Sequence, residues 1–161
     1  MKNIIKSIIL TVTVGLISFN ALAQKNDNVP QGVLSAFLTK YPQAQVKKWK
    51  STGNAYVAYF TNDNKKYMAS YSKTGEWVDT ERDISRSSGL PVGLQSFLKT
   101  GTYASWHIDD MKRVRTPLQN MYEIQLDNHS GSPFDYEDMG SAENRMLKFS
   151  DDGKLLSVVS L

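Results

Sequence analysis

The chain has 161 residues, with 19 Lys and Arg against 16 Asp and Glu, and it contains no cysteine. This length fits one domain or two small ones. The lack of cysteine excludes disulfides, thiolate metal sites, a cysteine nucleophile and a lipid-bearing cysteine, so an apolar core has to stabilise the fold.

The first 23 residues have the order of a secretory signal peptide. Lys2 and Lys6 precede a mostly apolar run, Ile8–Phe19, and Ala21-Leu22-Ala23 has the small-x-small pattern that signal peptidase cleaves. A membrane anchor is the alternative, but as a helix this run spans roughly 18 Å against about 30 Å of hydrocarbon. We expect residues 1–23 to be removed, giving a periplasmic or secreted product with no membrane insertion.

Loss of the signal peptide also changes the charge balance. Lys2 and Lys6 are its only charged residues, so the mature chain has 17 basic and 16 acidic residues, a net charge of +1. A nearly neutral protein has no general attraction for nucleic acid, and we expect no nucleic-acid partner. We interpret the basic groups at 47–50 and 112–115 as solvated strand faces rather than phosphate sites.

Residues 24–28 are polar and predict a loose tail, and residues 29–84 then predict one helix and four strands. Val29-Pro30 starts the helix, and Tyr41-Pro42 ends it because the residue before a proline avoids helical angles. Period-two alternation follows, in segments joined by short turns that favour an antiparallel meander. The strands are predicted at residues 46–50, 55–61, 66–72 and 76–82.

After a polar linker at 85–89, the same pattern begins again in residues 90–161. Leu90-Pro91 corresponds to Val29-Pro30, and Gly101 is expected to close the second helix. Strands are predicted at residues 103–114, 121–126, 145–150 and 154–159. The second half differs by an insertion at 127–144, a length of loop that is often functional or without fixed structure.

These elements predict an α+β fold of two tandem repeats, each with one helix packed on a four-stranded antiparallel sheet. Each half has fewer than about 75 residues, a size at which one core is marginal, so we expect the halves to pack together. The first helix is expected to cover two rows of side chains: Tyr56, Ala58 and Phe60, and Tyr67, Ala69 and Tyr71. The opposite sheet faces would then have no helix over them.

Several segments of the first half carry a family resemblance. They are Val29-Pro30, Ala36-Phe37 followed by Tyr41-Pro42, Lys48-Trp49, the run Tyr56–Phe60, and Gly75-Glu76-Trp77. Together they resemble the beta-lactamase-inhibitor-like, PepSY-like family of exported bacterial proteins, as two copies that cover nearly the whole mature chain. The second copy departs from the pattern, with Thr102-Tyr103 in place of the Tyr-Pro step. The resemblance implies tandem helix-on-sheet units and a concave sheet surface, and it implies no catalytic residues.

Motifs for catalysis or metal binding are largely absent from the sequence. His107 and His129 are the only histidines, and no zinc-protease, nucleophile-elbow or phosphate-loop motif occurs. We therefore expect no enzymatic activity and no cofactor. Four acidic residues near the insertion could offer oxygen ligands to calcium, but they lack the fixed spacing of a calcium loop, and we favour a solvated loop. They are Asp135, Glu137, Asp138 and Glu143.

Aromatic and methionine side chains give the strongest functional indication. Such residues on an open surface are typical of protein interfaces, although at strand spacing they also fill cores. The candidates are Trp49, Val57, Tyr59, Met68 and Trp77 in the first half, Trp106 and Tyr122 in the second, and Phe134 and Tyr136 in the insertion.

We therefore predict a non-catalytic exported binding module that acts through an open sheet face. Its partner would be an exported protein or peptide, and inhibition of a protease or another hydrolase is one possible role. The alternative is a receptor for a small molecule or peptide in the cleft between the two repeats.

Overall fold

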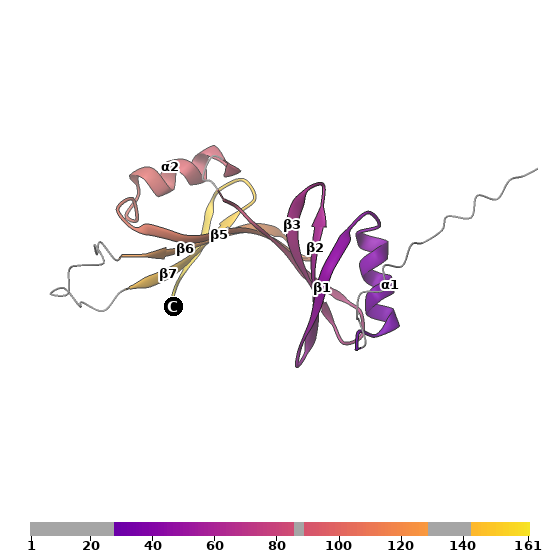
Figure 1. Ribbon diagram of the computed structural model, residues 1–161. Helices are drawn as coiled ribbons and strands as arrows, with labels where there is room; N and C mark the ends of the chain where they lie inside the picture. Colours follow the sequence, from indigo (N-terminus) through magenta and orange to yellow (C-terminus); the bar gives the residue numbers. More distant parts are fainter. Residues whose placement is uncertain (1–27, 86–88, 129–142) are drawn as a thin grey trace, which may run out of the picture.

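The computed structural model describes residues 28–85, 89–128 and 143–161. The predicted signal peptide and most of the 127–144 insertion lie outside these residues. The described part contains two helices and eight strands (Figure 1). In chain order they are α1 (Gln31–Lys40), β1 (Gln45–Thr52), β2 (Ala55–Asn62), β3 (Lys65–Ser72), β4 (Trp77–Asp83), α2 (Val92–Thr100), β5 (His107–Arg115), β6 (Asn120–Asp127), β7 (Asn144–Ser150) and β8 (Leu155–Ser160).

All eight strands belong to one antiparallel sheet, in the order β1 to β8. The two groups of four strands join because β4 pairs with β5, from Thr80 opposite Arg115 to Asp83 opposite Lys112. The prediction of a four-stranded sheet for each half is thus replaced by a single eight-stranded sheet. Two separate sheets would leave the backbone groups of β4 and β5 unpaired at two more edges, and the β4–β5 pairing satisfies these groups.

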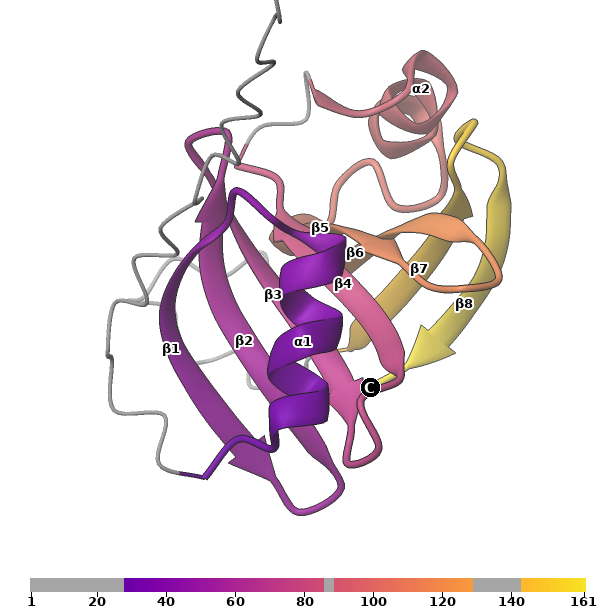
Figure 2. The ribbon, with the colours of Figure 1, turned by 90° about the vertical axis from the view of Figure 1, so that its right-hand side faces the viewer.

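Both helices pack on the same face of this sheet. Ala69, which faces α1, pairs with Thr80, and Thr80 pairs with Arg115 of the second half. Tyr122 of the α2 core pairs with Arg113, which lies two residues before Arg115 and so on the same face. Figures 1 and 2 show that the sheet bends between its two halves, with α1 and α2 on the outer side of the bend. The opposite face, called the helix-free face below, lies on the inner side.

The first core lies between α1 and strands β2 and β3. Val33 and Phe37, one helical turn apart, are buried against Ala58, Phe60, Ala69 and Tyr71. The two small alanines leave room for the Phe37 ring, whose centre lies 5.1 Å from that of Phe60. The predicted covered rows are confirmed, since Tyr56 and Tyr67 also pack against this cluster.

The second core repeats the arrangement under α2. Leu94 and Leu98 are buried together with residues of β6 and β7, namely Tyr122, Ile124, Leu126, Leu147 and Phe149. The α2 helix ends at Gly101 as predicted, with the Gly101 N–H donating to the Phe97 carbonyl at 2.8 Å.

The predicted strand from residue 103 is wrong at its start, because β5 begins only at His107. Residues 101–106 form successive turns, in which the Ala104 N–H donates to the Gly101 carbonyl and the Trp106 N–H to the Tyr103 carbonyl. The aromatic side chains of Tyr103 and Trp106 pack against the α2 core from these turns. No helix in the described part of the chain is both long and apolar enough to cross a membrane.

Candidate binding face

Tyr59 and Met68 form the centre of the helix-free face in the first half. They lie directly opposite each other on β2 and β3, and both remain partly exposed. The ammonium groups of Lys48 and Lys50 lie 4.6 Å and 5.4 Å from the centre of the Tyr59 ring. Cations at this distance are attracted to the ring face, so the two lysines restrict the orientation of Tyr59.

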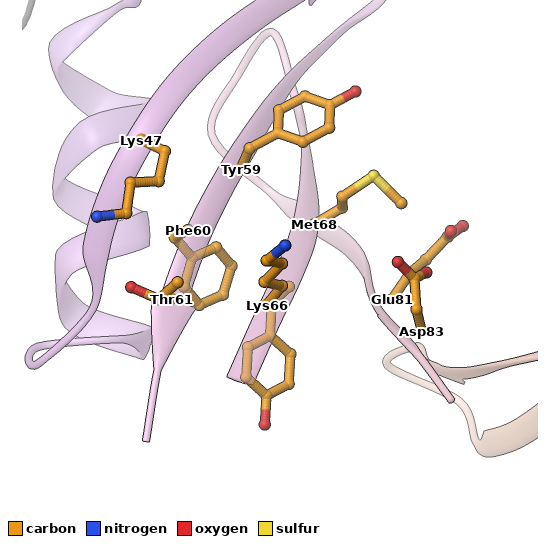
Figure 3. A pocket seen from close by; sticks show the side chains of 9 residues that line it. Lys47, Tyr59, Phe60, Thr61, Lys66, Met68, Glu81 and Asp83 are labelled. Carbon is orange, nitrogen blue, oxygen red and sulfur yellow. The ribbon is translucent and has the colours of Figure 1, made fainter. Parts of the chain in front are cut away.

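A pocket of about 330 Å³ opens beside this pair (Figure 3). Its lining residues are Lys47, Tyr59, Phe60, Thr61, Lys66, Tyr67, Met68, Glu81 and Asp83. In Figure 3 the lysines come from β1 and β3, whereas the two carboxylates come from β4. The pocket therefore has an apolar part, a basic rim and an acidic rim, and its volume falls in the range of known ligand sites.

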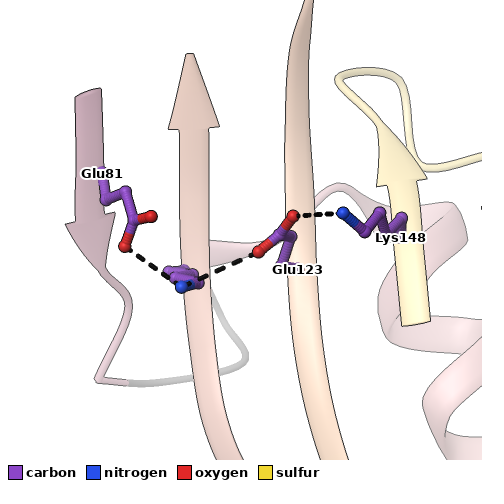
Figure 4. Close-up of polar contacts among 4 residues, drawn as sticks. Glu81, Glu123 and Lys148 are labelled. Atoms are coloured by element: carbon purple, nitrogen blue, oxygen red, sulfur yellow. Dashed lines mark hydrogen bonds and ion pairs between the residues drawn. The ribbon is translucent and has the colours of Figure 1, made fainter. Parts of the chain in front are cut away.

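Glu81 of the acidic rim is the first residue in a row of alternating charges that crosses the four strands β4 to β7 (Figure 4). Lys112 Nζ lies 3.1 Å from Glu81 Oε2 and 3.7 Å from Glu123 Oε2, and Lys148 Nζ lies 2.8 Å from Glu123 Oε1. Burial lowers the pKa of Lys112, but Glu81 and Glu123 outweigh this effect and raise it above its usual value. Lys112 therefore stays charged and holds Glu81 in place at the pocket rim.

Beside this row, two apolar residues of the helix-free face are buried. Val114 and Met121 lie opposite each other and next to Glu81 on this face, yet only 6% and 9% of their surface is exposed. No helix covers them, so the crowding of side chains on the inner side of the bend buries them. In the first half, the helix-free face stays accessible around Tyr59 and Met68, and in the second half Met146 and Val159 remain partly exposed on it.

Two predicted interface residues, Trp49 and Trp77, lie on the wrong face for that role. Trp49 is opposite Ala58, and its ring centre lies 5.4 Å from that of Phe37 in α1. Trp77 is opposite Tyr71, and both tryptophans pack against the first core. The ladder shifts register at Val46/Lys48 and at Ser70/Tyr71, and a bulge of this kind reverses the face that simple alternation assigns.

The other predicted residues divide into three groups. Val57, Tyr59 and Met68 share the helix-free face, as their register shows. Tyr122 is buried in the second core, so its predicted exposure is wrong, whereas Trp106 is only partly buried and packs against that core from the turn before β5. Phe134 and Tyr136 lie outside the described residues.

Sequence reasoning missed the charged lining of the pocket. Lys66 and Met68 are two residues apart on β3 and so share a face. Period-two alternation could therefore have placed Lys66 beside Met68. The position of Glu81 and Asp83 beside them depends on the pairing of β3 with β4. That register could not be read from the sequence.

The candidate catalytic and metal-binding residues gather into no site within the described ranges. His107 is exposed, with its Nε2 atom 4.0 Å from Asp109 Oδ1. Glu143 pairs with Arg145 at 2.9 Å. No group of three or more His, Cys, Asp or Glu side chains suited to a metal occurs in the part that the structure describes. His129, Asp135, Glu137 and Asp138 lie outside it.

An eight-stranded antiparallel sheet with both helices on one face defines an α+β protein of the beta-lactamase-inhibitor-like fold. The chain belongs to the family described as "Putative beta-lactamase-inhibitor-like, PepSY-like", whose model matches residues 20–69 and 54–157. The resemblance found in the sequence is confirmed by this match.

Solved structures from Bacteroides share the fold. A BLIP-like protein from Bacteroides fragilis is 21% identical, with a TM-score of 0.67 over 82% of this chain and 86% of that one. A DUF2874 family protein from Bacteroides ovatus is 23% identical, with a TM-score of 0.68 over 81% and 86%. A structure described as "putative periplasmic proteins", from Bacteroides eggerthii, is 20% identical, with a TM-score of 0.64 over 82% and 88%. No curated protein matches the chain significantly.

Proposed function

We propose that this chain is a non-catalytic, exported binding module that receives a segment of another exported protein on the helix-free face of its first half. The observation that carries the proposal is the 330 Å³ pocket beside Tyr59 and Met68, on a face that neither helix covers. The signal-like N-terminus supports export, as does the periplasmic description of one structural relative.

The chemistry of the pocket suggests what the partner segment carries. An apolar side chain would enter between Tyr59 and Met68, where aromatic and thioether groups offer polarisable contacts. A carboxylate on the same segment would meet Lys66, and a basic group would meet Asp83. Inhibition of a hydrolase is the finer role that the inhibitor-like family description supports.

We also propose that the chain consists of two tandem copies of one unit, residues 29–84 and 90–161, joined by the linker 85–89 and preceded by a cleaved signal peptide at 1–23. Each unit runs from a helix to four consecutive strands. In each, a glycine of the last hairpin turn lies against the start of the helix.

Photo-crosslinking in the exporting cells tests the binding role. A photoreactive amino acid is placed at position 59 or 68, and control probes are placed at Leu118 and Val92, which are 94% and 82% exposed away from the pocket. We expect one exported protein to be captured from positions 59 and 68 and from neither control. Equal capture from all four positions would contradict a specific face.

Affinity measurements with the captured and purified partner then test the pocket itself. Met68→Ala should weaken binding by about tenfold or more, since interface centres carry most of the binding energy. Met146→Ala is the matched control, because Met146 is also partly exposed on the helix-free face but lies in the second half. Equal losses for both variants, or none for Met68→Ala, would contradict the proposal.

A receptor for a small molecule or free peptide is the second candidate function, and the pocket volume favours it. All lining residues come from β1–β4, so such a ligand would bind within the first half and not in the expected cleft between the halves. A ligand specific to the folded state raises the melting temperature by mass action. Met68→Trp, which fills the pocket, should abolish that rise.

A further inference from the structure

The strand β8 forms one edge of the sheet and is poorly protected. Among the described residues only β7 pairs with it, so its outer side presents backbone N–H and C=O groups without strand partners. The strand has no charged residue and no proline. Leu156, Val158 and Val159 are 47%, 41% and 45% exposed. An uncharged edge with exposed apolar side chains, such as this six-residue strand, is a template for another strand.

The opposite edge, β1, shows the usual protection. It carries Lys47, Lys48 and Lys50, and its ladder with β2 shifts register at Val46/Lys48. Lysines and bulges on an edge strand oppose pairing with a further strand. The two edges of the same sheet are therefore not equivalent, and strand addition is expected at β8 only.

Backbone directions identify which β8 groups are available. The Leu161 N–H donates to the Asn144 carbonyl at 3.1 Å, so this residue points its backbone groups toward β7. Because the direction alternates along an antiparallel strand, Val159 also points inward, whereas Val158 and Ser160 point outward.

We propose that β8 pairs in antiparallel fashion with β8 of a second copy of this chain, with Val158 at the two-fold axis. The pairing is self-complementary because Val158 meets Val158 and Leu156 meets Ser160, and no like charges come together. A β1–β1 contact would instead oppose lysines. A β1–β8 contact would be heterologous and would leave a β8 edge free to add further copies, whereas the β8–β8 contact leaves only the two lysine-protected β1 edges and so ends at a dimer.

This inference is independent of the proposed function. The pocket lies in β1–β4, and β8 is at the far edge of the sheet. A monomeric protein that still binds a partner through Met68 would overturn the dimer alone. A dimer whose pocket binds nothing would overturn the function alone.

Sedimentation analysis of the exported protein over a concentration series tests the dimer. Val158→Lys places a charge at the axis and should weaken self-association by about tenfold or more, without lowering the melting temperature at dilutions where both proteins are monomeric. Val78→Lys is the matched control, since Val78 is 45% exposed but lies on the interior strand β4. Sedimentation of the unmodified protein as a monomer throughout the series would overturn the proposal, even if β8 bound an added peptide.

Proline substitutions test the predicted strand geometry. Val158→Pro removes an outward N–H, so it should abolish the dimer and leave the monomer folded. Val159→Pro removes an N–H that points toward β7, so it should lower the melting temperature of the monomer itself. If Val158→Pro left the dimer intact, the pairing of the two β8 strands would be disproved.

Discussion

Gly75, in the turn between β3 and β4, lies against the backbone of Gly32 at the start of α1. A Cβ atom on Gly75 would be 3.1 Å from the Gly32 carbonyl oxygen, and the φ angle of Gly75 is +93°. Gly153 repeats the relationship in the second half: its φ is +89°, and a Cβ atom added there would lie 3.1 Å from the Leu94 nitrogen. Each hairpin thus fixes the position of a helix on the sheet.

Gly75→Ala is expected to lower the free energy of unfolding by about 2 kcal/mol, because it combines an unfavourable positive φ with a close backbone contact. Gly53→Ala is the control: its φ is +43°, but a Cβ atom there would meet nothing within 4 Å. We expect a loss of about 1 kcal/mol for this variant. Urea unfolding of both proteins measures the difference, and equal losses would show that the helix contact contributes nothing.

Thr80 is a buried polar residue that links β4 to α1. Its hydroxyl donates to the Asp79 carbonyl at 2.9 Å and accepts from Trp77 Nε1 at 2.9 Å. The Tyr41 hydroxyl lies 2.5 Å away, and it is the donor in this pair because the Thr80 hydrogen is already used. Thr80→Val keeps the shape but removes the oxygen, so two partly buried donors, the Tyr41 hydroxyl and Trp77 Nε1, lose their partner.

We expect Thr80→Val to destabilise the fold by about 2–3 kcal/mol, the cost of unsatisfied buried polar groups. A double-mutant cycle with Tyr41→Phe isolates one of the two bonds. The double variant should be less destabilised than the sum of the single variants, as measured by urea unfolding. Strict additivity would mean that the Tyr41–Thr80 contact is energetically unimportant.

The hydroxyl of Tyr71 is buried and makes no hydrogen bond among the described residues. Burial raises the pKa of this phenol above its ordinary value of 10.0, and the neighbouring Tyr41 adds to the rise. The unfolded chain therefore releases this proton first, so the stability that the neutral phenol contributes is complete below about pH 10 and declines above it.

Tyr71→Phe should consequently be neutral or slightly stabilising at pH 7, and it should retain more stability than the unmodified protein above about pH 10. Urea unfolding at several pH values between about 7 and 11 measures both effects. Parallel decline of the two proteins in alkali would show that Tyr71 does not control it.

Lys112 joins the two halves of the sheet electrostatically. Its side chain is 22% exposed and contacts Glu81 on β4 and Glu123 on β6. Lys112→Met would leave the two carboxylates without their shared cation, and we expect a loss of about 1–2 kcal/mol. Lys148→Met, at the more exposed end of the row, should cost about 0.5 kcal/mol or less. Calorimetry measures both, and equal effects would contradict a special role for the central lysine.

The sequence predicted the helices and most strands because their signals are local. Pro30 and Pro91 mark the helix starts, and the alternation of Ala58 and Phe60 with Tyr59 separates the covered face of β2 from its open face. The same alternation failed for Trp49 and Trp77. Each lies near a register shift, and a shift depends on the partner strand rather than on the residue's own neighbours.

By itself, then, the sequence determined a fold without cysteine chemistry, the repeated order of a helix and four strands, and the membership of Tyr59 and Met68 in one open face, and it predicted a signal peptide. Only the tertiary structure decided that Thr80 pairs with Arg115 and merges eight strands into one bent sheet. It also decided that this bend buries Val114 while the pocket beside Glu81 stays open. Pairing between distant strands depends on which edges can satisfy each other's backbone groups, and no local pattern of side chains records that choice.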